Sequence, residues 1–219
     1  DSQSASDSLQ PSSLDSSFGA STHSPSKKSL RKILRARRRS LSRAQQRNAA
    51  LGLGRQFKQF AATRRIKSVA VYFANDGELD PSGLIQWCWT TGKQVVLPVL
   101  HPTRRNELLF LPYEPGTRLA RNRLGIPEPA ASHRLPRPLW TLDLVLTPLV
   151  GFDPTCHRMG MGGGFYDRTL APAFSGYTPR RPLLMGIAHE CQKLEQLPVE
   201  PWDIPLDGVI TDQTIYWAE

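Results

Sequence analysis

The residues with the clearest chemical potential lie between positions 143 and 170. An apolar run from Leu144 to Val150 is followed by Arg158, by four glycines within five positions, and then by Tyr166 and Asp167. Glycines let backbone N–H groups surround an anion, and the start of a helix adds partial positive charge. Arg158 can hold phosphate oxygens with two donors, and Asp167 offers the hard oxygen that Mg²⁺ prefers. The segment therefore predicts a polyphosphate site with a metal, most simply Mg²⁺-ATP.

The common phosphate-binding motifs do not describe this segment. A P-loop has Gly-Lys-Ser/Thr after its glycines, and no such sequence follows Gly164. A dinucleotide fingerprint lies directly after an early strand, whereas these glycines come late and are spaced Gly-x-Gly-Gly-Gly. The glycines alone would also fit a flexible turn that binds nothing. The charged residues Arg158, Asp167 and Arg168 on either side favour a binding site.

The positive charge of the chain is concentrated in one block. The net charge is +9, yet residues 27–67 hold fifteen Lys or Arg and no acidic residue, while residues 68–219 hold thirteen against sixteen acidic ones. Such a block suggests an anionic partner, and a nucleic-acid-binding module is one alternative for this chain. The block lacks interleaved aromatic residues before Phe57, and its apolar stripes suggest docking onto the domain. Nucleic acid is therefore the less favoured partner.

The composition predicts one domain with an N-terminal tail. Residues 1–26 contain eleven serines and no Lys or Arg, which is typical of a disordered tail. Residues 27–219 are expected to form a single α/β domain. The three cysteines have no CxxC spacing, so reduced thiols and a cytoplasmic location are expected. No membrane span and no signal peptide are expected.

Hydrophobic periodicity predicts alternating helices and strands. A helix from Ser29 would place Leu30, Ile33 and Leu34 on one inner face, and a second helix would begin at a capping box formed by Ser42 and Gln45. Further helices are expected from Asp80-Pro81 to about residue 91 and from about residue 166 to 174. Strands are expected at 67–73, 94–99, 107–111, 142–147, 182–188 and 208–211.

This alternation predicts a three-layer α/β/α sandwich around a mainly parallel sheet. In such folds, ligands bind beyond the carboxyl ends of the strands. Glu78, the glycine segment and Asp203 all follow strands or lie in late loops, so they are expected to converge there.

From Lys27 to the C-terminus, the chain resembles the 5-formyltetrahydrofolate cyclo-ligase (methenyltetrahydrofolate synthetase) family. Besides the glycine segment, five blocks agree in order, at residues 27–31, 77–80, 125–129, 197–203 and 207–212. The sequence departs from the family pattern at three positions: Cys156 stands where the family usually has Gly, Met159 where it has Leu, and Phe165 where it has Tyr. Of these departures, Cys156 puts the conformation of a turn in doubt.

The resemblance implies a monomeric enzyme of the cyclo-ligase fold. Its reaction would be the ATP- and Mg²⁺-dependent cyclisation of 5-formyltetrahydrofolate, with or without a polyglutamate tail, to 5,10-methenyltetrahydrofolate, with release of ADP and phosphate. The γ-phosphoryl group would pass to the formyl oxygen, and N10 of the same substrate would then attack the activated carbon. A diverged relative that kept the fold and lost the activity is the other alternative.

The resemblance also implies roles for matched residues. Catalysis would rest on Arg158, Tyr166 and Asp167, and Mg²⁺ would be held by Asp167 and Asp203. The nucleotide would be bound by Lys27, Lys28, Arg31, Arg158, Met159, Gly160, Met161, Gly162, Gly163, Gly164, Phe165 and Tyr166. The folate would be bound by Arg31, Phe73, Glu78, Gly160, Gly162, Gly164 and Tyr166. A solvated helix face for the α-helical cations, and a purely structural role for Phe73, are the alternatives at those positions.

Overall fold

The computed structural model describes residues 26–130, 135–176 and 180–218. The expected disordered tail at residues 1–26 lies outside them, apart from Ser26. The central feature is a seven-stranded sheet with the order β11-β10-β9-β6-β1-β2-β3. Its strands are β1 (Ser68–Ala70), β2 (Gln94–Leu100), β3 (Leu108–Pro112), β6 (Leu144–Pro148), β9 (Leu183–Ala188), β10 (Gly208–Thr211) and β11 (Ile215–Trp217).

The inner part of the sheet is parallel, as the alternation of elements predicts. β10, β9, β6, β1 and β2 pair in parallel, and the edge strands β11 and β3 are antiparallel to their neighbours. The inner strands are buried along almost their whole length, which explains why they are continuous apolar runs in the sequence.

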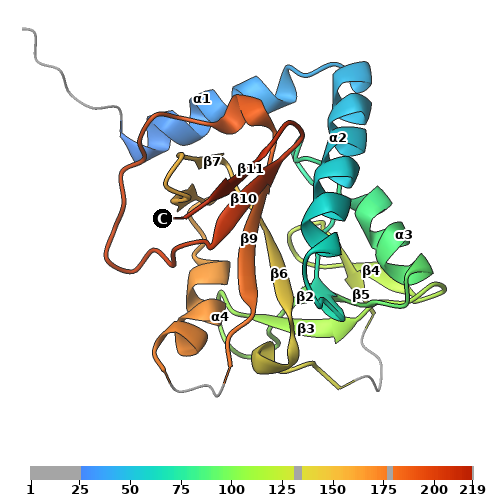
Figure 1. Ribbon diagram of the computed structural model, residues 1–219. Helices are drawn as coiled ribbons and strands as arrows, with labels where there is room; N and C mark the ends of the chain where they lie inside the picture. Colours follow the sequence, from blue (N-terminus) through green and yellow to red (C-terminus); the bar gives the residue numbers. More distant parts are fainter. Residues whose placement is uncertain (1–25, 131–134, 177–179, 219) are drawn as a thin grey trace, which may run out of the picture.

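Helices cover both faces of this sheet (Figure 1). On one face, α2 (Arg43–Ala62) and α3 (Ser82–Thr90) pack residues such as Phe57 and Ile85 against Val69 and Leu146. On the other face, α4 (Phe165–Phe174) packs Leu170 into a second apolar cluster with the opposite sides of the same strands. The three-layer arrangement expected from the sequence is therefore present.

The first helix, α1 (Lys27–Arg39), lies across the carboxyl end of the sheet rather than on either face (Figure 1). It contacts the short 3-10 helix η2 (Glu190–Gln192), which follows β9. Leu34 packs so closely on Gly151 that a Cβ there would lie 2.4 Å from Leu34 Cδ1. Because α1 crosses the edge at which ligands are expected, its side chains can reach a site there.

Several helix starts differ slightly from the predicted ones. α1 begins two residues before Ser29, with the Ser26 hydroxyl accepting from Ser29 N at 3.2 Å. The capping box of α2 is confirmed, since Ser42 and Gln45 exchange both hydrogen bonds. α3 begins at Ser82, and Asp80, two residues before it, accepts a hydrogen bond from Ser82 N at 2.9 Å.

Two other predictions were wrong in detail. Ile33 is 46% exposed and does not share the inner face of α1, which consists of Leu30, Leu34 and Arg38. The first strand is shorter than residues 67–73, because β1 ends at Ala70 and the chain then turns toward the carboxyl edge. The sequence did not predict the short pairs β4 (Leu119–Arg121) with β5 (Pro127–Pro129) and β7 (Gly151–Phe152) with β8 (Arg158–Met159), the edge strand β11, or the 3-10 helix η1 (Leu139–Thr141). None of the helices in the described ranges has the length and apolar character needed to cross a membrane.

Candidate active site

A cleft of about 940 Å³ opens at the carboxyl edge of the sheet. Its walls come from α1, from the segment that follows β1, from β2, from the glycine segment and from the start of α4. The segment containing Glu200 and Asp203 closes one side. This is the position at which a parallel α/β sheet places ligands, because loops leaving neighbouring strands diverge there.

One end of the cleft, here called the glycine end, is formed by the turn from Gly160 to Gly164 between β8 and α4. Gly162 and Gly164 have φ angles of +94° and +66°, a backbone region that favours glycine. No side chain caps the N-terminus of α4, for which Gly164 is the N-cap residue. The N–H groups of the first turn therefore remain available to an anion, and the helix dipole favours negative charge.

Arg158 lies beneath this turn on β8, with a side chain that is only 5% exposed. Its Nη2 donates to Asp167 Oδ1 at 2.5 Å, and its Nε is buried without a partner in the described part of the chain. A buried N–H without an acceptor is costly, and a phosphate oxygen would satisfy it. The guanidinium is therefore suited to an anion bound at the glycine end.

Two cations of α1 reach the same end. Lys27 Nζ lies 3.2 Å from Asp203 Oδ2 and 3.4 Å from Glu200 Oε1. Arg31 Nε donates to Gly160 O at 2.8 Å, and its guanidinium lies against Gly162. These contacts place α1 directly over the turn. They add positive charge next to the N-terminus of α4, where the helix dipole is also positive.

The carboxylates of Asp167 and Asp203 both line the cleft, and each is paired with a cation of the protein. Within the described residues, no group of three or more His, Cys, Asp or Glu could hold a metal by itself. Mg²⁺ that accompanies a nucleotide typically takes one or two carboxylates and completes its shell with phosphate oxygens and water. The pair therefore fits a metal that arrives with a nucleotide better than a resident metal centre.

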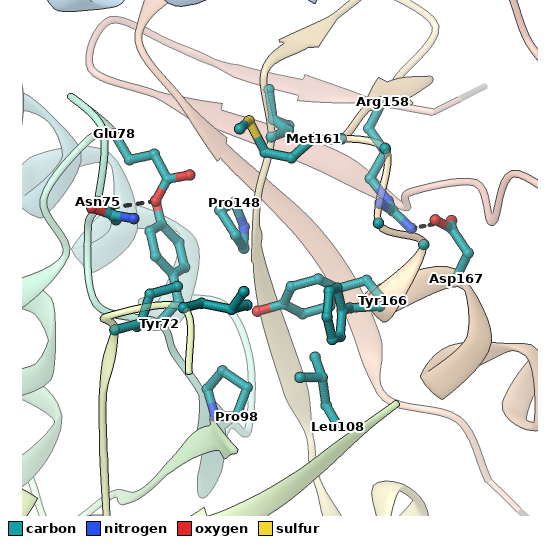
Figure 2. A pocket seen from close by; sticks show the side chains of 18 of the residues that line it. Tyr72, Asn75, Glu78, Pro98, Leu108, Pro148, Arg158, Met161, Tyr166 and Asp167 are labelled. Atoms are coloured by element: carbon teal, nitrogen blue, oxygen red, sulfur yellow. Dashed lines mark hydrogen bonds and ion pairs between the residues drawn. The ribbon is translucent and has the colours of Figure 1, made fainter. Parts of the chain in front are cut away.

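The other end, here called the Glu78 end, is lined by more aromatic and apolar side chains. Figure 2 shows the rings of Tyr72 and Tyr166 facing this space, with Pro98 and Leu108 beside them. Burial raises the pKa of both tyrosines well above the ordinary range, so each hydroxyl stays protonated. The Tyr72 hydroxyl donates to Leu79 O at 3.0 Å. A flat aromatic ligand would be held between apolar walls here.

Glu78 supplies the charged group of this end. Its side chain is 13% exposed, and Oε2 accepts a hydrogen bond from Asn75 N at 3.0 Å (Figure 2). Burial raises the pKa of Glu78 to about 7, and the nearby Arg38 guanidinium opposes this shift. A carboxylate in an apolar pocket is a suitable acceptor for two adjacent N–H groups of a heterocycle.

Most residues predicted for the site line this one cleft. These are Lys27, Arg31, Phe73, Glu78, Arg158, Gly160, Met161, Gly162, Gly163, Gly164, Phe165, Tyr166, Asp167 and Asp203. Two others do not line it: Lys28 is exposed on α1, and the Met159 side chain packs in a small core with Leu30 and Leu197. Met159 alternates with Arg158 along β8, so one faces the core while the other faces the cleft.

Several residues of the cleft wall were not identified from the sequence, among them Tyr72, Arg38, Asn75 and Trp202. Tyr72 lay within a predicted strand, and its position near the carboxyl end of that strand was the available signal. Arg38 was one of many arginines in α1, and nothing in the local pattern distinguishes it. Asn75 and the 68% exposed Trp202 also line the cleft.

Comparison with known proteins gives a consistent result. A profile described as the 5-formyltetrahydrofolate cyclo-ligase family matches residues 23–212. The 5-formyltetrahydrofolate cyclo-ligase of Escherichia coli K12 is 44% identical over 184 residues, which are 84% of this chain and 99% of the relative. The enzyme of the same name from Haemophilus influenzae is 40% identical over 181 residues, covering 83% and 95% of the two chains.

Solved structures agree with the sequence relatives. The solution structure of a 5,10-methenyltetrahydrofolate synthetase from Aquifex aeolicus matches with a TM-score of 0.72 and 29% identity, covering 87% of this chain and 92% of the other. A 5,10-methenyltetrahydrofolate synthetase from Mycoplasma pneumoniae matches with a TM-score of 0.67, covering 85% and 98%. At 24% identity, the second match supports the fold alone.

Proposed function

The chain belongs to the 5-formyltetrahydrofolate cyclo-ligase family and catalyses the cyclisation of 5-formyltetrahydrofolate. We propose that it uses Mg²⁺-ATP for this reaction. 5-Formyltetrahydrofolate, with or without a polyglutamate tail, would be converted to 5,10-methenyltetrahydrofolate, with release of ADP and phosphate. The observation that supports the proposal is that one cleft has two ends of different chemical character. The glycine end suits a polyphosphate, and the Glu78 end suits a flat heterocycle with adjacent N–H groups.

The chemistry explains why both ends are needed. A formyl oxygen is a poor leaving group, so it must be phosphorylated before N10 of the same substrate can displace it. Transfer of a phosphoryl group depends on positioning and on neutralising charge more than on a protein nucleophile. Arg158 and Lys27 would supply positive charge around the phosphates, and the amides of the glycine turn would hold their oxygens.

Asp167 and Asp203 would hold the metal, directly or through water, once their cations turn to the phosphates. Mg²⁺ supplies neutralisation of the phosphate charge and fixes the orientation of the transferring group. Tyr166, one residue before Asp167, would pack against the folate at the point where the two ends meet. The neutral hydroxyl can also donate a hydrogen bond there.

At the Glu78 end, the carboxylate would accept hydrogen bonds from the pterin amino group and the neighbouring ring N–H. The apolar wall formed by Phe73, Pro98 and Leu108 would hold the ring in one plane. The orientation fixed in this way would direct N5 and its formyl group toward the glycine end. Because attack by N10 is intramolecular, correct orientation of the folate is a large part of what the protein must provide.

Neither alternative function has a specific observation in its favour. The cations of α1 that a nucleic acid would need are partly used within the protein, since Arg38 is buried and Arg35 pairs with Asp76. A diverged, inactive relative would be suggested by a damaged turn at Cys156. That residue has a φ of +64°, the conformation in which a glycine is usual, so the turn is preserved.

We further infer that the enzyme acts in the cytoplasm as a monomer. Cys88, Cys156 and Cys191 are free thiols, which is typical of proteins in a reducing compartment. The monomeric state is what the family resemblance implies.

The test is a spectrophotometric assay with 5-formyltetrahydrofolate and Mg²⁺-ATP that follows the near-ultraviolet absorbance of the methenyl product. We expect an ATP-dependent rise, and a loss of at least a hundredfold in turnover for Asp167→Asn, because a metal ligand is removed while its shape is kept. The exposed Glu195→Gln is the matched control and should retain full turnover. Undiminished turnover in Asp167→Asn would refute the metal assignment. A folded protein that binds ATP without turnover would favour the inactive relative.

A further inference from the structure

One of the largest fully buried side chains of the described residues is an arginine, Arg38 of α1. Its Nε donates to Asp76 O at 2.8 Å, its Nη2 to Asp76 Oδ2 at 2.9 Å and its Nη1 to Leu149 O at 3.1 Å. Nη2 also lies 3.6 Å from Glu78 Oε1. Burying a guanidinium is costly unless its donors are satisfied, so this arrangement calls for a reason beyond filling space.

The turn that Arg38 holds is the one that carries Glu78. Glu78 N donates to Asn75 O at 3.0 Å, and the two central residues, Asp76 and Gly77, have φ angles of +54° and +75°. Positive φ at both central positions is typical of a type I′ turn, and Asp-Gly is one of the sequences that favour it. Arg38 anchors this turn to α1 through both the backbone carbonyl and the side chain of Asp76.

We propose that Arg38 is a positioning residue for the cyclo-ligase reaction, which directs the Glu78 carboxylate into the cleft and places a positive charge beside it. The inference rests on the proposed function, in which Glu78 accepts the N–H groups of the pterin. A neutral carboxylic acid would present one donor and could not accept two hydrogen bonds with full strength. Arg38 does not itself need to touch the substrate.

The charges around Glu78 support this role. Burial raises the pKa of Glu78 to about 7, Arg38 and the Asn75 N–H lower it, and Asp76 raises it. From the other elements, Tyr72 and Tyr166 have pKa values raised by burial and, to a lesser degree, by the charge of Glu78, so both hydroxyls stay neutral. His189, which contacts Gly77 O at 3.3 Å, has a pKa lowered by burial and stays neutral at pH 7. Arg38 therefore supplies the positive charge that partly offsets the rise in the pKa of Glu78 caused by burial.

The test is calorimetric titration of the full chain with 5-formyltetrahydrofolate between pH 5.5 and 8.5. In the wild type, the Kd should rise as the pH falls through about 7, because protonation removes the acceptor. In Arg38→Met, the midpoint should move upward by about one pH unit, so that binding at pH 7 is several-fold to tenfold weaker. Arg38→Lys should return the midpoint toward that of the wild type, because it restores the charge.

A second variant predicts a shift of opposite sign. Asp76→Asn removes the negative charge that raises the pKa of Glu78 and keeps a residue that tolerates positive φ, so its midpoint should move downward. Arg35→Met is the matched control, since Arg35 Nε also binds Asp76 Oδ2, at 2.8 Å, yet does not face Glu78. Its midpoint should stay near that of the wild type.

The outcomes separate this inference from the proposed function. If Glu78→Gln weakens folate binding and abolishes its pH dependence, the role of Glu78 stands. Unchanged midpoints in Asp76→Asn and in the Arg38 variants would then overturn the role of Arg38 alone. If Glu78→Gln leaves the Kd unchanged at all pH values, the folate assignment of Glu78 fails, and the inference about Arg38 fails with it.

Discussion

The two ends of the cleft are built on different principles. The glycine end comes largely from one continuous segment between Arg158 and Asp167, and α1 adds its cations from above. The Glu78 end is assembled from β2, β3, α4 and the turn after β1, with Arg38 of α1 beneath it. The first end depends on local backbone conformation, whereas the second depends on packing between segments far apart in the sequence.

This difference predicts different consequences of substitution. Apart from the buried Arg158, the charged groups at the glycine end are paired but partly exposed, so their interactions contribute modestly to stability and are free to exchange for a ligand. The carboxylate and guanidinium at the Glu78 end are buried, so their energies are part of the stability of the fold. We therefore expect function to be separable from stability at the first end and coupled to it at the second.

The largest expected effect is loss of turnover in Arg158→Met. Methionine fills much of the same volume but removes both the donor to Asp167 and the unpartnered Nε. We expect kcat to fall by about 10³, because a preorganised group that stabilises developing charge is lost. The Kd for 5-formyltetrahydrofolate should change little, since Arg158 does not belong to the Glu78 end. Arg104→Met, which removes an exposed guanidinium that pairs with Glu107 and does not line the cleft, is the control. Equal losses in the two variants would contradict the specific role of Arg158.

The same contrast explains how far the sequence could predict the site. The glycine end was predictable because its determinants are neighbours in the chain: the glycines, Arg158 and the start of α4. The sheet was also predictable, because its inner strands are buried on both sides and appear as apolar runs such as residues 144–147. The capping box at Ser42 is likewise local.

The features that escaped prediction depend on contacts between distant segments. In an arginine-rich helix, the buried Arg38 cannot be distinguished by pattern from exposed neighbours such as Arg37. Ile33 was assigned to the inner face of α1 because it is apolar. The buried residue that follows Leu30 and Leu34 on that face is instead an arginine, Arg38. The strand pair β4–β5 is short and contains two prolines and exposed residues, so it lacks the alternation that indicates a strand.

The next largest expected effect is on the stability of Glu78→Gln, which tests whether stability and function are coupled at the Glu78 end. The pKa of Glu78 rises from 4.5 to about 7 in the folded protein. At about 1.4 kcal/mol per pKa unit, keeping the carboxylate ionised destabilises the fold by up to about 3 kcal/mol above pH 7. Glu78→Gln removes this charge, so we expect it to raise the free energy of unfolding by about 1–3 kcal/mol at pH 8 while weakening folate binding.

The sign of the pH dependence follows from the direction of the pKa shift. A group with a raised folded pKa causes no loss of stability below its unfolded pKa, and the loss grows as the pH rises through the folded value. The advantage of Glu78→Gln should therefore be full above pH 7 and absent near pH 4.5. Urea denaturation at several pH values measures it. If the variant is less stable than the wild type at pH 8, the ionised Glu78 carboxylate does not destabilise the fold, and the expected conflict between stability and folate binding is absent.

The smallest expected effect concerns Cys156, in the turn that leads into the glycine end. Its φ of +64° is strained for any residue with a Cβ, and its side chain is buried in the core under the sheet. Cys156→Ala loses the buried sulfur and keeps the strain, whereas Cys156→Gly loses both the sulfur and the Cβ and so relieves the strain. We expect the Gly variant to be more stable than the Ala variant by about 1 kcal/mol, the reverse of the usual order. Both should keep near-normal kcat, because Cys156 does not line the cleft. An Ala variant that is the more stable of the two would mean that the turn relaxes out of the left-handed conformation.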